Sequence, residues 1–346
     1  MKDAAGILAR YWDHLDPVHY EPDSGLINQT WTVGEPAWGV LQWVNPIFDP
    51  AIHKDIEAFT ARLEEVGLTT PRLLPTRQGD LCAVDATGCW RLMTYIPGRT
   101  LHRLASSEQA AAAGDLVGRF HRALAGWVYT IQAPRRHIHD TTFHMAELHG
   151  ACAEIKHHPL SQDASALGSE ILARWAEWGT EMPRDHRFSH GDLKISNLRF
   201  EEEDEIAVCL IDLDTLGSMP ISCEMGDAWR SWCNPAGEDD PSRVVFDLGL
   251  FESSARAWLA SAPPLNDEEL TSLVPGIERI CLELAARFCA DALHNTYFRE
   301  NRERHPQRGS HNLLRARAQL ALANSARQQR AECETIVASA SDRLTV

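Results

Sequence analysis

The chain has 346 residues, of which 44% are hydrophobic and 24% charged, so one large or two medium globular domains with an ample core are expected. The formal net charge of −16 argues against a non-specific nucleic-acid-binding protein, because phosphate backbones repel an acidic surface. Residues 1–10 lack a signal-peptide core and no apolar run reaches membrane-spanning length, so we expect a cytoplasmic protein with no membrane partner.

The nine cysteines are scattered along the chain, and none of them forms a Cys-x-x-Cys pair. This spacing disfavours both a zinc site and a disulfide framework, and it favours reduced, buried thiols. Lysine is scarce, with only four in the chain, so arginine carries most of the positive charge.

The first part of the chain mixes strand-like and helical patterns. The predicted elements are a helix at 7–15, a β-hairpin at 24–33 and 38–44, a helix at 51–66, and strands at 81–85 and 90–95. The last strand leads into Ile96-Pro97-Gly98, and this apolar run into Pro-Gly predicts a hinge between two parts of the chain or a plain strand–turn boundary.

From residue 99 onward the pattern is mainly helical. The predicted elements are helices at 108–125, 169–178, 242–260, 267–274 and 275–298, and a strand at 206–211. Histidines between 137 and 149 suggest a metal site, but no matching set of carboxylates completes it, so surface or core histidines are expected there.

A polar turn, His190-Gly191-Asp192-Leu193-Lys194-Ile195-Ser196-Asn197, precedes the apolar strand, which ends in Asp212-Leu213-Asp214. Phosphoryl transfer needs a positioned nucleophile, a held metal ion and neutralised phosphoryl charge. These two segments offer a residue type for each task. The alternative is that their polar residues only form a turn and cap the end of a strand.

Each polar residue of these segments suits one role. Asp192 is the candidate base for a substrate hydroxyl, and Lys194 can neutralise the transferred phosphoryl oxygens. Asn197 and Asp212 carry the oxygen ligands that Mg²⁺ prefers. Two carboxylates about 4 Å apart repel by roughly 4 kcal/mol at an effective dielectric near 20, so Asp192 and Asp212 in one site require a cation or a proton.

The His-x-Asp-x-Lys-x-x-Asn spacing resembles the protein-kinase catalytic loop, with Gly191 where that loop usually has Arg. Ile-Asp-Leu-Asp in place of Asp-Phe-Gly resembles the aminoglycoside phosphotransferase and choline kinase branch of the same fold. The resemblance implies an α+β, two-lobed protein-kinase-like fold that binds ATP and Mg²⁺ between its lobes. The implied domains are an N-lobe at 1–94, a hinge at 95–98 and a C-lobe at 99–346.

The same resemblance implies which residues bind the nucleotide. Gly25 and Asn28 would lie over the phosphates, although one glycine fits an ordinary β-turn equally well. Tyr95 and Ile96 would read the adenine edge. Gln42 stands where the fold normally carries a strand lysine. Either Gln42 acts as a neutral substitute, or an arginine such as Arg91 replaces the lysine, or binding relies on Mg²⁺ and Lys194.

A narrower resemblance is to the bacterial N-acetylhexosamine 1-kinase group. It rests on six segments that span most of the chain: Gly25-Leu26-Ile27-Asn28, Val40-Leu41-Gln42, His139-Asp140-Thr141, Ile211-Asp212-Leu213-Asp214-Thr215, Gly226-Asp227-Ala228 with Arg230, and His311-Asn312-Leu313 with Arg315, Arg317 and Gln319. It implies transfer to the anomeric hydroxyl of a sugar. Asp214, Asp227 and Arg230 are the candidate acceptor-binding residues, and a helix-capping role for Asp227 is the alternative.

Two other functions remain open from the sequence. The acceptor of the same kinase chemistry can be an amino alcohol, homoserine or an aminoglycoside, and a cationic acceptor would need additional carboxylates facing Asp192. A non-catalytic nucleotide-binding pseudokinase is the other possibility. The missing strand lysine favours it, and the complete Asp192, Asn197 and Asp212 set opposes it.

Overall fold

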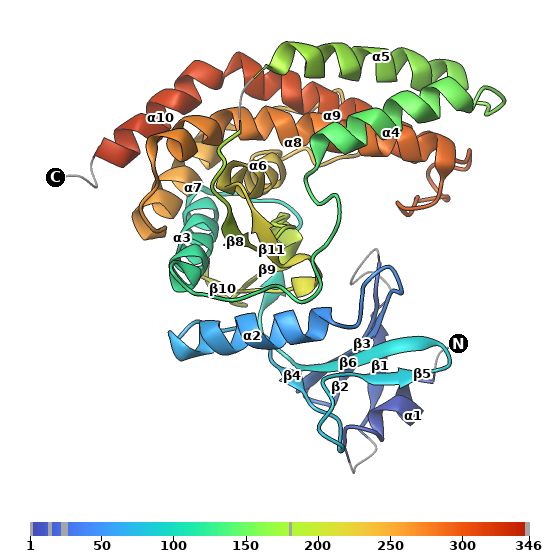
Figure 1. Ribbon diagram of the computed structural model, residues 1–346, viewed down its shortest axis with the longest axis vertical. Helices are drawn as coiled ribbons and strands as arrows, with labels where there is room; N and C mark the ends of the chain where they lie inside the picture. Colours follow the sequence, from blue (N-terminus) through green and yellow to red (C-terminus); the bar gives the residue numbers. More distant parts are fainter. Residues whose placement is uncertain (1–2, 13–15, 22–26, 180–181, 343–346) are drawn as a thin grey trace.

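The computed structural model describes residues 3–12, 16–21, 27–179 and 182–342. A smaller part built on an antiparallel sheet is joined to a larger, mainly helical part (Figure 1). This is the two-lobed α+β architecture that the sequence predicts. Gly25 and residues 13–15 lie outside the described residues, so their predicted structure and role stay predictions. The bounds of the helix predicted at 7–15 are wrong, because the helix there is Ala4–Leu8 and residues 9–11 form a turn.

The smaller part contains a six-stranded sheet in the order β1-β2-β3-β6-β4, with β5 paired to β6. Its strands are β1 (Val18–Glu21), β2 (Gln29–Val33), β3 (Gly39–Val44), β4 (Leu73–Leu74), β5 (Ala83–Asp85) and β6 (Gly88–Thr94). Every pair is antiparallel. The predicted hairpin is confirmed as β2 and β3, whose register pairs Val33 with Gly39.

Side chains of β6 alternate between the two faces of the sheet, as a strand requires. Trp90 and Leu92 pack into a small core with α1 (Ala4–Leu8). Cys89 and Met93 pack on the opposite face, in the core that contains the buried residues of α2 (Ile52–Glu65). Helix α2 lies along this face, between the sheet and the helical part (Figure 1). Arg91 shares this face by period, so it also points toward the rest of the molecule.

The helical part is organised around one long helix, α8, which packs against α4, α5, α6 and α9. Its helices are α3 (Ser107–Leu124), α4 (Thr141–Glu154), α5 (Ser161–Trp178), α6 (Ile221–Trp232), α7 (Leu248–Ser261), α8 (Asp267–His294), α9 (Ser310–Gln328) and α10 (Arg330–Asp342). No helix in the described ranges is both long and apolar enough to span a bilayer.

The prediction of two helices, at 267–274 and 275–298, is wrong, because α8 continues through Pro275. A proline removes one backbone hydrogen bond and normally ends or kinks a helix. Here the packing on both sides fixes the helix: the Pro275 carbonyl accepts a hydrogen bond from Trp178 Nε1 at 3.1 Å. The backbone of Gly276 lies so close to α6 that an added Cβ would be 2.2 Å from the carbonyl oxygen of Ser222.

Two further boundaries differ from the sequence prediction. Helix α7 begins at Leu248 rather than at 242, because Asp247 caps it by accepting the Leu250 N–H at 3.0 Å. Helix α5 begins at Ser161, earlier than the predicted 169, and α4 was not predicted at all. Histidines interrupt the apolar positions of α4, so its apolar face is only weakly marked in the sequence and gives no clear helical periodicity.

Short elements bring the two polar segments side by side. These elements are β7 (Arg99–Thr100), β8 (Arg187–Ser189), β9 (Leu198–Phe200), β10 (Ala207–Leu210), β11 (Gly217–Met219) and the 3₁₀ turns Ile195–Asn197 and Leu213–Thr215. Strands β9 and β10 pair at one end of the segments, and β8 and β11 pair at the other. The loops between these strands, 190–197 and 211–216, therefore run next to each other.

Candidate active site

Helix α6 holds the loop at 190–197 through a buried carboxylate, Glu224. Its Oε1 accepts the His190 N–H at 2.7 Å and its Oε2 accepts the Gly191 N–H at 2.9 Å. Burial would raise the pKa of Glu224, but His121, His190 and the Gly191 N–H lower it below the ordinary glutamate value. The carboxylate therefore stays charged and fixes the start of the loop.

Residues two turns further along α6 hold the rest of the same loop. Ser231 Oγ accepts the Ile195 N–H at 2.9 Å, and Trp232 Nε1 donates to the Leu193 carbonyl at 2.8 Å. Both contacts use the loop backbone, so they fix the path of the chain and leave the polar side chains of the loop free.

Gly191 is required by the neighbouring loop. Its φ is +81°, and a Cβ at this position would lie 2.4 Å from the Thr215 carbonyl oxygen. Thr215 Oγ1 also donates to the His190 carbonyl at 2.8 Å, which keeps the two loops in contact. This close approach explains why glycine stands where the protein-kinase loop has arginine.

His190 joins Asp192 to the end of β10. Its Nε2 lies 2.9 Å from the Ile211 carbonyl, which can only accept, so Nε2 carries the proton. The other ring nitrogen, Nδ1, accepts the Asp192 N–H at 3.3 Å. The His190 Nε2 contact with the Ile211 carbonyl and the 2.8 Å bond from the Ile211 N–H to the Asn197 carbonyl register the two loops against each other.

The four residues predicted to be catalytic or metal-binding lie around a common space. Lys194 Nζ is 2.5 Å from Asp192 Oδ2 and 3.7 Å from Asp212 Oδ2. Asn197 Nδ2 donates to both the carbonyl and the Oδ2 of Asp192, at 2.8 and 3.0 Å. The side chains of Asp192, Lys194 and Asp212 are 30, 37 and 38% exposed, so a ligand can reach all three.

The two carboxylates of this cluster have opposite pKa shifts. Burial would raise the pKa of Asp192, but the Lys194 ammonium lowers it below its ordinary value. For Asp212, burial outweighs Lys194 and, with the neighbouring charges of Asp214 and Asp192, raises its pKa above the ordinary value. Asp212 is therefore short of positive charge, and a cation bound beside it would stabilise its ionised form.

The donor set fits a hard divalent cation such as Mg²⁺. The amide nitrogen of Asn197 donates to Asp192, so the amide oxygen points away from that carboxylate. Asp212 follows β10 in a left-handed conformation, with φ of +63° and ψ of 58°. Carboxylate and amide oxygens at the ends of two adjacent loops are the ligands that Mg²⁺ takes from proteins.

A second, buried network joins the other predicted residues across the two parts of the molecule. Asn28 Nδ2 donates to Asp214 Oδ2 at 2.6 Å, and Arg91 forms an ion pair with the same carboxylate. Arg91 Nε also donates to Gln42 Oε1 at 2.8 Å, and these two residues are register partners on β6 and β3. Gln42 in turn donates to Thr30 Oγ1 at 3.1 Å.

This network places a positive charge beside Gln42. The side chains of Arg91 and Asp214 are only 1 and 2% exposed, so the pair is shielded from solvent. Burial would raise the pKa of Asp214, but Arg91 and Asn28 lower it below the ordinary value. Of the three possibilities that the sequence leaves open, Arg91 is the one with a charge at this position. The structure also groups Asp214 with the nucleotide candidates, apart from the acceptor candidates Asp227 and Arg230.

Asp227 and Arg230 form a buried pair one helical turn apart on α6. Arg230 Nε and one terminal nitrogen donate to Asp227 Oδ1 at 3.2 and 2.9 Å, and its other terminal nitrogen donates to Glu238 at 3.1 Å. Asp227 Oδ2 is buried and has no hydrogen-bond partner in the described part of the chain. The alternative role of Asp227 as a helix cap is wrong, because it lies in the middle of α6.

The segment at 95–98 follows β6 directly. The Tyr95 N–H donates to the Trp38 carbonyl at 2.9 Å, and the Ile96 carbonyl accepts from Arg199 at 3.3 Å. Arg199 also donates to the Gly98 carbonyl. Among the described residues, the Tyr95 carbonyl and the Ile96 N–H make no hydrogen bond, so these two groups remain for a ligand edge.

Sequence reasoning missed the residues of α6 that support the loop. Glu224, Asp227 and Ser231 follow one another at spacings of three and four, which places them on one face of a helix. That spacing was readable in the sequence and predicts a polar face aimed at one target. The pairing of Asp214 with Arg91 is harder to read from the sequence, because the two residues meet only after the sheet has formed.

Residues 20–260 match the model of the phosphotransferase enzyme family, APH. The chain belongs to this family. The predicted class of enzyme, a kinase that phosphorylates an alcohol group, is thereby confirmed at the level of the family.

Solved structures with the same fold include several named kinases. A microcompartment-associated aminopropanol kinase has a TM-score of 0.62 at 17% identity, over 94% of this chain and 97% of its own. An amicoumacin kinase with AMP-PNP and Ca²⁺ has a TM-score of 0.57 at 13% identity, over 88 and 89% of the two chains. A choline/ethanolamine kinase family protein from Mesorhizobium loti has a TM-score of 0.55 at 14% identity, over 93 and 92%. At these identities the similarity shows the fold alone.

Proposed function

We propose that this phosphotransferase transfers the γ-phosphoryl group of ATP to a hydroxyl group of a sugar, with the anomeric hydroxyl of an N-acetylhexosamine as the first candidate. The observation that carries the proposal is the half-exposed Asp192 carboxylate, held beside Lys194 and Asn197 and facing Asp212 across Lys194. This arrangement offers a base, a phosphoryl-binding cation and metal ligands within one small space.

In the proposed reaction, Asp192 orients the acceptor hydroxyl and takes its proton as the oxygen attacks the γ-phosphorus. The bond between the γ-phosphorus and the bridging oxygen breaks, and ADP leaves with that oxygen. The lowered pKa of Asp192 keeps it ionised and ready to accept the hydrogen bond. Lys194, which can turn from its carboxylate partners, neutralises the equatorial oxygens.

Asn197 and Asp212 would hold Mg²⁺ in this proposal. When bound, the ion neutralises phosphate charge that would otherwise oppose the attack. It would also relieve the unfavourable burial of the Asp212 carboxylate. Lys194 contacts both Asp192 and Asp212, and it supplies one positive charge for two negative ones.

The nucleotide would lie between an N-lobe at 1–94 and a C-lobe at 99–346, across a hinge at 95–98. We propose that the Tyr95 carbonyl and Ile96 N–H pair with the adenine edge, because the described contacts leave these two groups open. Gly25 and Asn28 would cover the phosphates. Gln42 would serve by holding Arg91, which carries the charge of the missing strand lysine.

The acceptor side favours a neutral, hydroxyl-rich molecule. Asp227 is already paired with Arg230, so the pair offers an acceptor and donors without a net charge. The unpartnered Asp227 Oδ2 can accept a sugar hydroxyl, and a buried acceptor left without a donor costs about 1–3 kcal/mol. The segments shared with the N-acetylhexosamine 1-kinase group support the same choice.

An amino alcohol, homoserine or aminoglycoside acceptor is the second candidate. Glu238 supports it, because this carboxylate lies beyond Arg230 and makes the acceptor side more acidic. The fold shared with an aminopropanol kinase is compatible with it. The assembled Asp192, Asn197 and Asp212 set argues against the pseudokinase alternative.

An ADP-release assay with a panel of acceptors tests the proposal. The panel contains N-acetylglucosamine, N-acetylgalactosamine, galactose, choline, aminopropanol, homoserine and kanamycin. We expect turnover with an N-acetylhexosamine and a loss of about 10²–10⁴-fold in Asp192→Ala. Glu203→Gln, which changes an exposed acid in the turn between β9 and β10, is the matched control and should retain full activity.

The outcomes separate the candidates. Preferential turnover of an amine-bearing acceptor would replace the sugar by the second candidate. Equal rates for Asp192→Ala and wild type would contradict the role of Asp192. ATP binding without turnover of any acceptor would favour the pseudokinase.

A further inference from the structure

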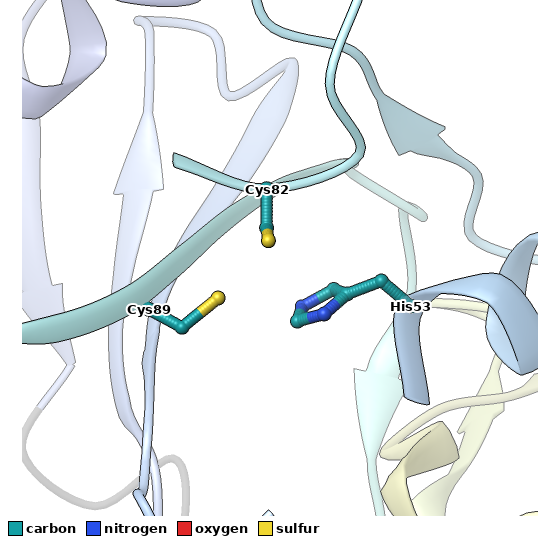
Figure 2. Close-up of side chains that lie close together, drawn as sticks. All are labelled: His53, Cys82 and Cys89. Carbon is teal, nitrogen blue, oxygen red and sulfur yellow. The ribbon is translucent and has the colours of Figure 1, made fainter. Parts of the chain in front are cut away.

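Three potential metal ligands converge in the smaller part of the molecule, and none of them belongs to the loops at 190–197 and 211–216. His53 lies in the first turn of α2, Cys82 immediately precedes β5, and Cys89 lies on β6. Figure 2 shows their side chains pointing toward one shared space from the helix and from the hairpin. One ligand atom from each lies within 4.8 Å of the other two, and within the described ranges no other group of three or more such residues exists.

The histidine ring has the tautomer that a metal ligand needs. His53 Nδ1 lies 2.8 Å from the Pro50 carbonyl, which can only accept, so Nδ1 carries the proton. In the neutral ring, Nε2 is then the nitrogen that can bind a metal ion. It is buried and has no hydrogen-bond partner among the described residues, and His53 as a whole is 1% exposed. A bond from the second nitrogen to a backbone carbonyl is the usual way in which proteins orient a metal-ligating histidine.

The two cysteines supply a buried and an accessible ligand. Cys89 is 9% exposed and lies on the α2 face of β6, as the core packing of its neighbours shows. Cys82 is half-buried, at the start of the hairpin. Thiolates and a neutral imidazole are the ligands that zinc and similar soft cations prefer. The partly exposed Cys82 gives an ion a route to the site.

We propose that His53, Cys82 and Cys89 form a binding site for a thiophilic divalent cation of the zinc class. His53 Nε2 and the two Sγ atoms are three ligands, and a water molecule or a small anion completes the tetrahedron. Ligand atoms around tetrahedral zinc are about 3.8 Å apart, so the three side chains need to move together by about 1 Å. Cysteine binds such an ion as the thiolate, so binding displaces any thiol proton still present and the affinity increases with pH.

An ion at this position would affect the part of the sheet that carries Arg91. It would join α2 to the β5–β6 hairpin by bonds stronger than the apolar packing there. Cys89 and Arg91 lie two residues apart on the same face of β6, so the ion would be next to the Arg91–Asp214 pair. Binding would then stabilise the sheet face that carries this pair.

The protein contains a natural control for the two thiols. Cys152 and Cys289 each donate to the same carbonyl, that of Ala164, at 3.6 and 3.4 Å. This second pair belongs to no group of potential ligands within the described ranges. Two neighbouring thiols are therefore found both at Cys82 and Cys89 and at Cys152 and Cys289. Of the two, only the Cys82 and Cys89 pair belongs to a described group of potential ligands that includes an imidazole.

The test uses the full-length protein, purified with a reductant and a chelator and then titrated with Co²⁺ as a spectroscopic substitute for zinc. We expect one ion per chain, with thiolate-to-cobalt charge-transfer absorption and the intense visible bands of tetrahedral cobalt. His53→Gln, Cys82→Ser and Cys89→Ser should each weaken binding by at least about tenfold, whereas Cys152→Ser should bind like wild type. Circular dichroism checks that each variant is folded.

A second measurement needs no variant. Zinc should slow alkylation of Cys82 by at least about tenfold in the wild-type protein while leaving Cys152 unchanged, as read by peptide mass mapping. Failure of zinc to protect Cys82 would overturn the proposal. So would equal cobalt affinity in Cys82→Ser and wild type. A Cys82–Cys89 disulfide in protein purified without reductant, with no ion bound after reduction, would assign the pair to thiol oxidation instead.

Discussion

The catalytic loop and the buried Arg91–Asp214 network both present charged groups to the same site, but they are assembled in different ways. The catalytic loop comes from one short segment, and α6 fixes its backbone through Glu224 and Ser231. The network joins residues from three strands, the segment before β2 and one loop, and it exists only when β3 and β6 are in register.

The contacts of the loop therefore position catalytic side chains, whereas the contacts of the network join the two parts of the molecule. The loop residues stay partly exposed because their backbone carries the constraints. The ion pair of the network, Arg91 and Asp214, is almost fully buried, and its side chains themselves hold the two parts of the molecule together. Breaking the network should therefore cost mainly stability, and changing the loop should cost mainly rate.

Removing one member of the buried pair gives the largest expected loss of stability. Arg91→Met leaves the Asp214 carboxylate buried without its cation, and such a change typically costs about 3–5 kcal/mol. We expect urea unfolding to shift to lower denaturant and KM for ATP to increase. The double variant Arg91→Met with Asp214→Leu should be more stable than Arg91→Met alone, because no unpaired charge remains. Equal stability of the two variants would show that the ion pair is not the joining element.

Glu224→Gln tests the support of the catalytic loop. The amide can accept only one of the two N–H groups of His190 and Gly191, and its own NH₂ group would face the other donor. We expect a loss of about 2–3 kcal/mol in unfolding free energy and a lower kcat with little change in KM for ATP. Glu203→Gln serves again as the exposed control. An unchanged kcat would mean that the loop keeps its conformation without this carboxylate.

The smallest expected effect is the pH dependence of stability from the buried His139–Glu283 pair, which lies outside both the catalytic loop and the Arg91–Asp214 network. His139 Nδ1 lies 3.2 Å from Glu283 Oε1 in the core of the helical part. Burial would lower the pKa of His139, but Glu283 raises it above the ordinary value, even though Arg287 opposes the shift. Burial would raise the pKa of Glu283, but His139 and Arg287 lower it to about 2.

The sign of the pH dependence follows from these shifts. The contribution of Glu283 is complete above its unfolded pKa of about 4.3 and is lost as the pH falls toward 2. The contribution of His139 is complete below its unfolded pKa of about 6.5 and is lost as the pH rises through its higher folded pKa. Unfolding free energy should therefore decline as the pH rises above about 6.5, and His139→Gln should remove that part of the decline. A wild-type slope preserved in His139→Gln would contradict the pairing.

These contrasts also explain how far the sequence could be read. Asp192, Lys194, Asn197 and Asp212 were identified because their fixed spacing encodes a loop and a strand end, and the structure brings them together. The two-lobed fold followed from the same segments. The loop support by Glu224 was readable from helical spacing but was not recognised.

The remaining features depend on tertiary structure. The partner of Gln42 is set by strand register, which no local pattern reveals, so the sequence left three possibilities open. The convergence of Cys82, Cys89 and His53 likewise requires α2 to pack on the hairpin, and the spacing of the cysteines alone argued against zinc. Pro275 shows the converse, because packing around α8 overrides a local break.

The most direct test of the shared metal position is a Mn²⁺ titration followed by electron paramagnetic resonance, with AMP-PNP present. We predict that Asp212→Asn binds Mn²⁺ at least about tenfold more weakly than wild type, because it replaces a charged carboxylate ligand by a neutral amide. Binding of AMP-PNP without a metal should change little. Unchanged Mn²⁺ affinity in Asp212→Asn would contradict the assignment of Asn197 and Asp212 as the ligands of the divalent ion.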